Sequence, residues 1–209
     1  MFAGKISDVA LMLAQDILPI YEREAAQWAR DRPALGWERL VLQEALAGLA
    51  APRLLDLGCG TGLPVAAWCQ AQGATVTGVD GAAAMIELLR ANVPGARAIC
   101  ADMRGLALGE RFDAILAIDS FFHLSATDQR AMFPTFAAHA APGARLVLTT
   151  GYSAGETWGQ VGGSTVYHAS LAPDEYRALL AANGFDEMWF RRKDRALGGR
   201  SVWLAQAQV

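Results

Sequence analysis

The sequence predicts a single α/β domain in which helices cover both faces of a mostly parallel β-sheet. Short apolar segments alternate with helical patterns between residues 53 and 149, which is the arrangement of βαβ units. The chain has 209 residues, 53% of them hydrophobic, so it can bury one large core. Near the C-terminus, two apolar segments flank Leu197-Gly-Gly-Arg200, which predicts an antiparallel hairpin at the edge of the sheet.

The first fifty residues are expected to be helical. Apolar side chains recur at about one helical turn from Ile6 to about Arg32, with Ser7 able to cap the start. Pro19 is expected to kink or divide this stretch, because proline lacks a backbone N–H. A second helix is expected over residues 37–49.

The strands of the core are expected to be short and apolar, over residues 53–57, 75–79, 96–101, 112–118 and 144–149. Helices are expected between them, over residues 63–72, 82–92 and 126–140, and a later one over 173–183. Residues 151–170 are rich in glycine and polar groups, which predicts a long functional loop. The C-terminal hairpin should pair residues 185–191 with 201–207.

Composition favours a soluble protein of a reducing compartment, and we expect a cytoplasmic one. The formal net charge of −3 argues against a nucleic-acid or anionic-membrane partner. Cys59, Cys69 and Cys100 are odd in number and lack paired spacing, so neither disulfides nor zinc are indicated. We see no leader pattern and no apolar run of the roughly 20 residues that a membrane span needs.

A glycine-rich loop after the first strand is the most informative motif. Gly58, Gly60 and Gly62 stand at alternate positions in Leu54-Leu-Asp-Leu-Gly-Cys-Gly-Thr-Gly-Leu63. Glycine adopts positive φ without steric cost and has no Cβ, so backbone can approach a ligand closely. The second strand ends in Asp80, at the spacing where a carboxylate meets the two hydroxyls of a ribose.

Two further strands also end in carboxylates, Asp102 and Asp119. In an open α/β sheet, ligands bind outside the carboxyl ends of the strands, so all of these positions should face one crevice. A single carboxylate there could be only a helix cap or a surface charge. Their placement at successive strand ends favours a binding site.

These motifs together resemble the ordered motifs of class I S-adenosylmethionine-dependent methyltransferases. The resemblance rests on Leu54–Leu63, Val79-Asp80, Ala101-Asp-Met103 and Phe112–Leu124, and covers about half of the chain. It implies a Rossmann-like, doubly wound sheet of seven strands with an antiparallel last strand. It also implies the cofactor S-adenosylmethionine and the product S-adenosylhomocysteine. We therefore expect one methyltransferase domain over residues 1–209, with an N-terminal helical lid over 1–50, a cofactor-binding core over 51–209 and a substrate loop at about 151–170.

The resemblance also implies roles for single residues. The loop glycines would approach the methionine portion and the ribose, Asp56 would anchor the amino end, and Asp80 would accept both ribose hydroxyls. Asp102 would accept from the adenine amino group beside Met103, and Asp119 would lie along the methionine tail. Gly81 departs from the small hydroxyl residue expected there, although glycine is still an acceptable helix N-cap.

A dinucleotide is the alternative cofactor, with an oxidoreductase as the alternative function. Its Gly-x-Gly-x-x-Gly fingerprint needs a third glycine where this chain has Leu63. Pyrophosphate would also be repelled by the extra carboxylates. A third possibility is a non-catalytic protein that binds S-adenosylmethionine.

His123 is the candidate catalytic residue, as a base or as a donor that positions the acceptor. It follows the fourth strand at the mouth of the crevice, and imidazole titrates near neutral pH. A buried structural histidine is the alternative role, and it is the one favoured for His139. His168 lies where the long loop could return to the pocket. Tyr21 and Trp28 share a helix face and are expected either to pack in the core or to cover the cofactor as part of a lid.

The signatures of several methyltransferase classes are missing. Asp119-Ser-Phe-Phe122 replaces the Pro-Pro motif of enzymes that methylate amino groups of nucleic acids, and no cysteine follows a proline as in cytosine C5 enzymes. Thr149-Thr-Gly-Tyr152 offers no evident ligands for the magnesium of catechol-type enzymes. By elimination, we expect a metal-independent enzyme with a small-molecule acceptor, whose identity and acceptor atom the sequence leaves open, as it does the oligomeric state.

Overall fold

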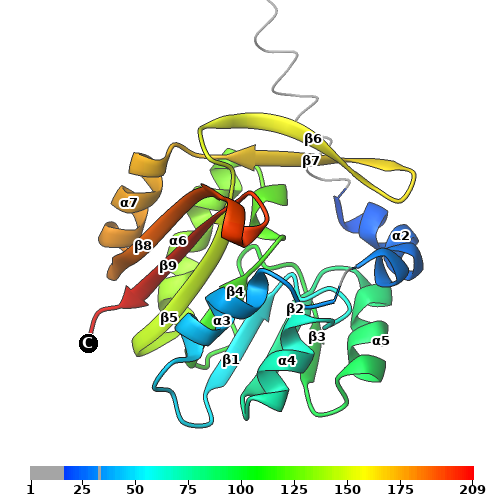
Figure 1. Ribbon diagram of the computed structural model, residues 1–209, viewed down its shortest axis with the longest axis horizontal. Helices are drawn as coiled ribbons and strands as arrows, with labels where there is room; N and C mark the ends of the chain where they lie inside the picture. The colour runs from blue at the N-terminus through cyan, green and yellow to red at the C-terminus, as the bar shows by residue number, and fades with distance from the viewer. Residues whose placement is uncertain (1–16, 33) are drawn as a thin grey trace, which may run out of the picture.

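A seven-stranded sheet with the order β3-β2-β1-β4-β5-β9-β8 forms the centre of the molecule (Figure 1). The computed structural model describes residues 17–32 and 34–209. All neighbouring strands are parallel except β9, which is antiparallel to both β5 and β8. The predicted fold class, with its antiparallel last strand, is confirmed.

The strands alternate with helices as predicted, within a few residues at each end. The strands are β1 (Arg53–Leu57), β2 (Thr75–Asp80), β3 (Arg97–Cys100), β4 (Phe112–Ala117), β5 (Ala140–Thr150), β8 (Phe185–Asp194) and β9 (Arg200–Ala207). The helices are α2 (Ile17–Asp31), α3 (Glu38–Leu46), α4 (Val65–Ala71), α5 (Ala83–Asn92), α6 (Ala126–His139) and α7 (Pro173–Ala182), with short 3-10 turns η1 (Phe121–His123) and η2 (Arg195–Leu197).

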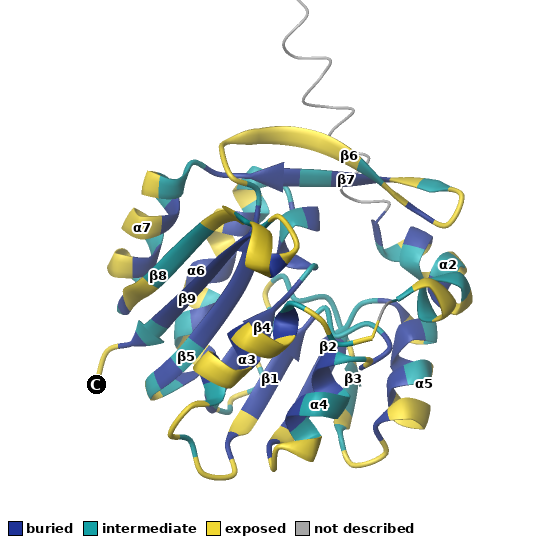
Figure 2. Cartoon of the chain, in the orientation of Figure 1, coloured by how far each residue is buried: buried dark blue, intermediate teal, exposed yellow. Residues whose placement is uncertain are grey.

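Two hydrophobic clusters fill the space on either side of the sheet. One joins the sheet to α6 and α7 through Phe112, Phe133, Phe136, Tyr176 and Trp203, all at most 1% exposed. The other joins it to α3, α4 and α5 through aliphatic side chains such as Leu42, Leu54 and Leu89. Figure 2 shows the strands buried between these layers. Burial on both faces explains why the parallel strands are apolar along most of their length.

Residues 151–170 differ from the expected loop, since they contain a β-hairpin. Strands β6 (Gly155–Val161) and β7 (Ser164–Ser170) pair antiparallel and form a second sheet, which lies across the C-terminal ends of the main strands (Figure 1). β6 is mostly exposed, whereas β7 is mostly buried (Figure 2). An exposed polar strand such as β6 has the composition of a loop, so the sequence pattern does not distinguish the two.

Helix α2 packs against the tip of this hairpin. Ile17 and Ile20 form a buried cluster with Val161 and Val166. Pro19 stands two residues after the first described residue of the helix, so the kink or division expected of the longer stretch is not tested by the described residues. The expected helical start from Ile6, with its Ser7 cap, lies outside the described residues. In the described part of the chain, we find no helix with both the length and the apolar character to cross a membrane.

Candidate active site

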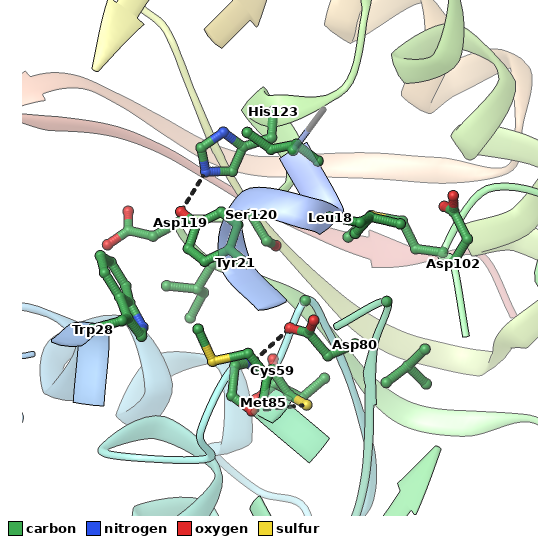
Figure 3. Close-up of a pocket in the computed structure, with 18 of the residues that line it drawn as sticks. Leu18, Tyr21, Trp28, Cys59, Asp80, Met85, Asp102, Asp119, Ser120 and His123 are labelled. Carbon is green, nitrogen blue, oxygen red and sulfur yellow. Dashed lines mark hydrogen bonds between the residues drawn. The ribbon is translucent and has the colours of Figure 1, made fainter. Parts of the chain in front are cut away.

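One cavity opens at the C-terminal ends of the parallel strands, beneath α2 (Figure 3). It brings together residues that the sequence had placed at separate strand ends. Of the predicted site residues it is lined by Tyr21, Trp28, Asp56, Gly58, Gly60, Asp80, Gly81, Asp102, Met103, Asp119 and His123. Gly62 is the exception among them.

The glycine loop is fixed against β2 by its own backbone. The N–H groups of Gly58 and Cys59 both donate to the carbonyl of Val79, at 2.8 and 3.1 Å. Gly58 has a φ of +71°, and a Cβ added there would lie 2.3 Å from the Cβ of Ser120. Glycine is therefore required at this position by both its backbone angle and its neighbour.

Gly62 lies outside the cavity lining, contrary to the expectation that it approaches a cofactor. A Cβ added there would lie 2.4 Å from Leu89 Cδ1 and 2.8 Å from Val93 Cγ2, on and just after helix α5. Its φ is +77°. This glycine allows the loop to pack against a helix, which the motif alone could not distinguish from a contact with ligand.

The carboxylate of Asp80 organises the loop and faces the cavity. One oxygen accepts from the N–H of Gly60 and the other from that of Ala82, each at 2.9 Å. Burial raises the pKa of Asp80, although these two backbone donors act in the opposite direction. Each oxygen keeps a second lone pair, so the group can still accept two hydroxyls.

Asp56 is a buried carboxyl group to which no backbone or side-chain group donates within the described residues. It stands in β1, is 3% exposed and lines the cavity. Burial, with a smaller contribution from the negative charge of Asp80, raises its pKa to about 7. A buried carboxyl without a partner can be stabilised by a cationic ligand group in the cavity.

Asp102 is hydrogen-bonded to Arg104, a residue that no motif in the sequence indicates. Arg104 donates to it through its backbone N–H at 2.9 Å and through Nε at 2.9 and 3.0 Å. Although partial burial acts in the opposite direction, these bonds lower the pKa of Asp102. Acceptance from an adenine amino group would therefore compete with Arg104.

Asp119 is held between two arginines from opposite ends of the chain. Arg32 Nη1 lies 3.3 Å from Asp119 Oδ2, and Arg200 Nε lies 3.1 Å from Asp119 Oδ1. Arg32 also pairs with buried Glu38 at 3.1 Å. Asp119 has a φ of +50°, which is unfavourable for an L-residue and is more common at functional sites. No signal in the sequence identified either arginine.

Gly81 departs from its expected role as helix cap. The N-cap of α5 is Ala82, and a Cβ added at Gly81 would lie 2.5 Å from Leu18 Cδ2. Leu18 also lines the cavity. The absence of a side chain at position 81 lets α2 approach the end of β2, which explains the departure noted in the motif.

Tyr21 and His123 form a hydrogen-bonded pair at the cavity (Figure 3). His123 Nδ1 is 2.9 Å from the carbonyl of Tyr167, so it must donate its proton there. Burial lowers the pKa of His123 to about 4, so the ring is neutral and Nε2 accepts from the Tyr21 hydroxyl at 2.8 Å. His123 is thus buried and bonded to a carbonyl of strand β7, and it also lines the site.

The other candidate side chains are divided between packing and the site. The Trp28 ring meets that of Tyr21 edge to face, with centroids 5.7 Å apart, and its Nε1 lies 3.7 Å from the position of a Cβ at Gly60. His139 is buried and bonded to the backbone of Leu108, so its role is structural. His168 lies outside the cavity, although its ring centroid is 4.8 Å from that of His123.

Comparisons with known proteins agree on one chemistry. Residues 54–143 match the family described as "Methyltransferase domain". The chain is 30% identical over 191 residues to dTDP-3-amino-3,6-dideoxy-alpha-D-glucopyranose N,N-dimethyltransferase of Streptomyces fradiae, covering 85% of this chain and 68% of that protein.

Solved structures extend the likeness to nearly the whole chain. CalS10, an amino pentose methyltransferase from Micromonospora echinaspora bound to S-adenosylmethionine, matches with a TM-score of 0.67, 25% identity and coverage of 89% and 96% of the two chains. The 1,6-didemethyltoxoflavin-N1-methyltransferase of Burkholderia thailandensis, bound to S-adenosylhomocysteine, matches with a TM-score of 0.70, 20% identity and coverage of 100% and 92%. At 20% identity, the likeness to this second enzyme shows the fold alone.

The cavity itself fits the cofactor of these relatives. S-adenosylmethionine carries an ammonium group and a vicinal diol. The ammonium group matches the buried carboxyl of Asp56, to which no described residue donates, and the diol matches the free lone pairs of Asp80. The glycine loop, which lets backbone approach a ligand closely, stands between Asp56 and Asp80 in the sequence. A dinucleotide fits less well, because the loop lacks the third glycine of its fingerprint. The four carboxylates that line the cavity would also repel a pyrophosphate. The chain therefore belongs to the class I S-adenosylmethionine-dependent methyltransferases and is an enzyme that acts on a small molecule.

Proposed function

We propose that this enzyme methylates an amine nitrogen of its small-molecule acceptor, without a metal. The observation that carries the proposal is the 30% identity to an amino-sugar N,N-dimethyltransferase over 85% of the chain. The likeness to an amino pentose methyltransferase supports it. An amino sugar is accordingly the first acceptor class to test.

We assign the cofactor-binding roles from the geometry of the cavity. Asp80 accepts the ribose hydroxyls, and Asp56 pairs with the ammonium group of the methionine tail. Gly58 and Gly60 let the backbone approach the same ligand. Asp119 keeps the strand end beside the methionine tail in place, because two arginines fix its side chain.

The adenine end is assigned to Asp102 and Met103, which line the cavity with Gly81. Because Arg104 already occupies both carboxylate oxygens of Asp102, the Met103 backbone becomes the more available polar contact. Leu18 and Trp28 contribute apolar surface from α2.

When bound, S-adenosylmethionine supplies a methyl group that is already activated on a sulfonium. The protein then has to hold the acceptor in line with the methyl–sulfur bond. Proximity and orientation can lower the activation barrier by about 7–11 kcal/mol. Because Tyr21 donates its proton to His123, the phenol oxygen is left as an acceptor for an N–H of the incoming amine. A neutral amine attacks through its lone pair and needs no base, so we assign this pair to orientation.

Metal-free chemistry remains a proposal that rests on this argument and on the missing magnesium motif. Among residues 17–32 and 34–209, no three His, Cys, Asp or Glu side chains are grouped as a metal site would need. A cytoplasmic location and the absence of a nucleic-acid partner also remain predictions.

We further propose that helix α2 acts as a lid and that residues 151–170 bind the acceptor; α3, which also belongs to the lid expected over residues 1–50, packs against the sheet instead. Helix α2 lines the cavity, and the β6–β7 hairpin reaches its edge at His123, which contacts both the Tyr21 hydroxyl and the Tyr167 carbonyl. A cover of this kind excludes water and completes the site after the cofactor binds.

The test is incorporation of labelled methyl into matched pairs of acceptors that differ only in an amine or a hydroxyl. The panel includes free 3-amino sugars and a dTDP-linked 3-amino sugar, with mass spectrometry to locate the added methyl. Transfer to the amine member of a pair is expected, without loss of rate in the presence of a chelator. Transfer to hydroxyl or carboxylate oxygen alone would contradict the assignment.

A further inference from the structure

A second depression adjoins the cofactor cavity under the β6–β7 hairpin. We call it the hairpin groove; its lining includes Phe122, Thr150, Tyr152, His168, Lys193 and Arg200. Two contacts link it to the cofactor cavity. His168 of the groove meets His123 of the cavity edge to face, with ring centroids 4.8 Å apart, and Arg200 binds Asp119 at 3.1 Å. A molecule in the groove would therefore have the reactive end of the site as its neighbour.

The two depressions have opposite charge. The cofactor cavity is lined by four carboxylates and two arginines, namely Asp56, Asp80, Asp102, Asp119, Arg32 and Arg104. The hairpin groove is lined by two cations, Lys193 and Arg200, and one carboxylate, Glu156. Glu156 already accepts from the Tyr167 hydroxyl at 2.7 Å. The first environment suits a cationic cofactor, whereas the second suits an anion.

An irregularity in β8 aims Lys193 at the groove. The register with β9 shifts between Arg191 and Asp194, and Lys193 has a φ of +47°. The backbone N–H of Lys193 donates to Ser201 Oγ at 3.2 Å, which holds the bulge. β-bulges re-aim side chains and are frequent beside active sites. A bulge that also forces an L-residue into the left-handed region is a second sign of a functional position.

The ammonium group of Lys193 lies over an aromatic ring and has no carboxylate partner among the described residues. Its Nζ is 3.5 Å from the centroid of Tyr152, another groove residue, and Arg192 approaches the same ring at 5.6 Å. A cation–π contact orients the ammonium group without neutralising its charge. Lys193 is exposed, so it can reach an incoming anion.

We infer that the hairpin groove binds an oxyanion of the methyl acceptor through Lys193, while the amine end of the same molecule faces Tyr21 and His123. The acceptor is then an amine that also carries a phosphate or a carboxylate. The orientation of the acceptor rests on the proposed amine function. The presence of an anionic group on it rests on the residues of the groove alone.

The experiment is calorimetric titration of the protein saturated with S-adenosylhomocysteine. The probes are thymidine 5′-diphosphate with thymidine as its uncharged match, and glucuronate with glucose as its match. The variants are Lys193→Gln, Lys193→Arg and the control Arg195→Gln, which removes an exposed charge from the η2 turn outside the groove. Thermal unfolding establishes that each variant is folded.

At least one anionic probe is expected to bind more tightly than its uncharged match. Loss of one charge-assisted contact predicts about three- to tenfold weaker binding in Lys193→Gln. Lys193→Arg should restore most of the affinity, and Arg195→Gln should leave it unchanged. Binding of the diphosphate alone identifies a phosphorylated acceptor, and binding of glucuronate alone identifies a carboxylate.

The inference is overturned if neither anion binds better than its match, or if Lys193→Gln and Arg195→Gln weaken binding equally. Because the titration needs no turnover, its outcome is separable from that of the amine assignment. If an anion binds in a Lys193-dependent way but methylation occurs at oxygen alone, the anion site in the hairpin groove is supported and the amine acceptor is contradicted.

Discussion

Asp56→Asn should stabilise the free protein at high pH while weakening its hold on the cofactor. The folded structure raises the pKa of Asp56 from 3.8 to about 7, because the carboxyl is buried without a hydrogen-bond donor among the described residues. A pKa raised on folding gives stability that is complete below the unfolded value and is lost as pH rises through the folded value. Above pH 7, the ionised group therefore opposes folding.

The magnitude follows from the pH interval over which the folded group titrates. Stability changes by about 1.4 kcal/mol per pH unit between the two pKa values, so raising the pH from 5 to 7 costs about 3 kcal/mol. Asparagine at this position has no such dependence. For a chain of this size, each kcal/mol shifts Tm by about 2–4 °C, so the Tm advantage of Asp56→Asn should grow by about 6–12 °C over this interval.

The assay is thermal unfolding of both proteins from pH 5 to pH 8, with exposed Asp174→Asn as control. The difference between the two curves removes contributions from the other titrating groups. In parallel, calorimetry at pH 8 should show S-adenosylhomocysteine bound at least about tenfold more weakly by Asp56→Asn, since a charged partner of the ammonium group is lost. A Tm difference independent of pH would refute the burial argument, and unchanged affinity would refute the role in binding.

Two further variants test the loop and the tyrosine. Gly58→Ala should lose about 2–5 kcal/mol of stability, from the left-handed backbone and the contact with Ser120, whereas Gly105→Ala, at φ +66° in open space, should lose only about 1–2 kcal/mol. Equal losses in denaturant titrations would show that close packing does not constrain position 58. Tyr21→Phe should lower kcat about 5- to 100-fold, because the acceptor and His123 each lose a hydrogen-bond partner, with S-adenosylhomocysteine affinity nearly unchanged. A parallel fall in that affinity would instead assign Tyr21 to the cofactor.

The sheet and its acidic edge were predictable because local patterns determine them. Apolar runs identify strands that are buried on both faces, and the carboxyl ends of parallel strands meet at one edge. The strand-end argument therefore predicts that Asp80, Asp102 and Asp119 share one cavity, which all three line. The glycine motif likewise predicted the tight loop, because its backbone angles are local.

The remaining features depend on contacts between distant parts of the chain. Arg32 and Arg200 meet Asp119 across 87 and 81 residues, and no spacing rule connects such positions. The role of Gly62 depends on where α5 packs. The β6–β7 hairpin was hidden because its outer strand is polar and exposed, so its composition was that of a loop.

The most direct test of the account is the affinity of Asp80→Asn for S-adenosylhomocysteine, measured by calorimetry on protein shown to be folded. Asp80 links the glycine loop to the helix start, and in our account it accepts two ligand hydroxyls. Loss of two charge-assisted hydrogen bonds, at about 1.5–3 kcal/mol each, predicts binding weakened by about a hundredfold or more. A folded Asp80→Asn protein that binds the product as tightly as the parent would contradict the proposed position of the cofactor.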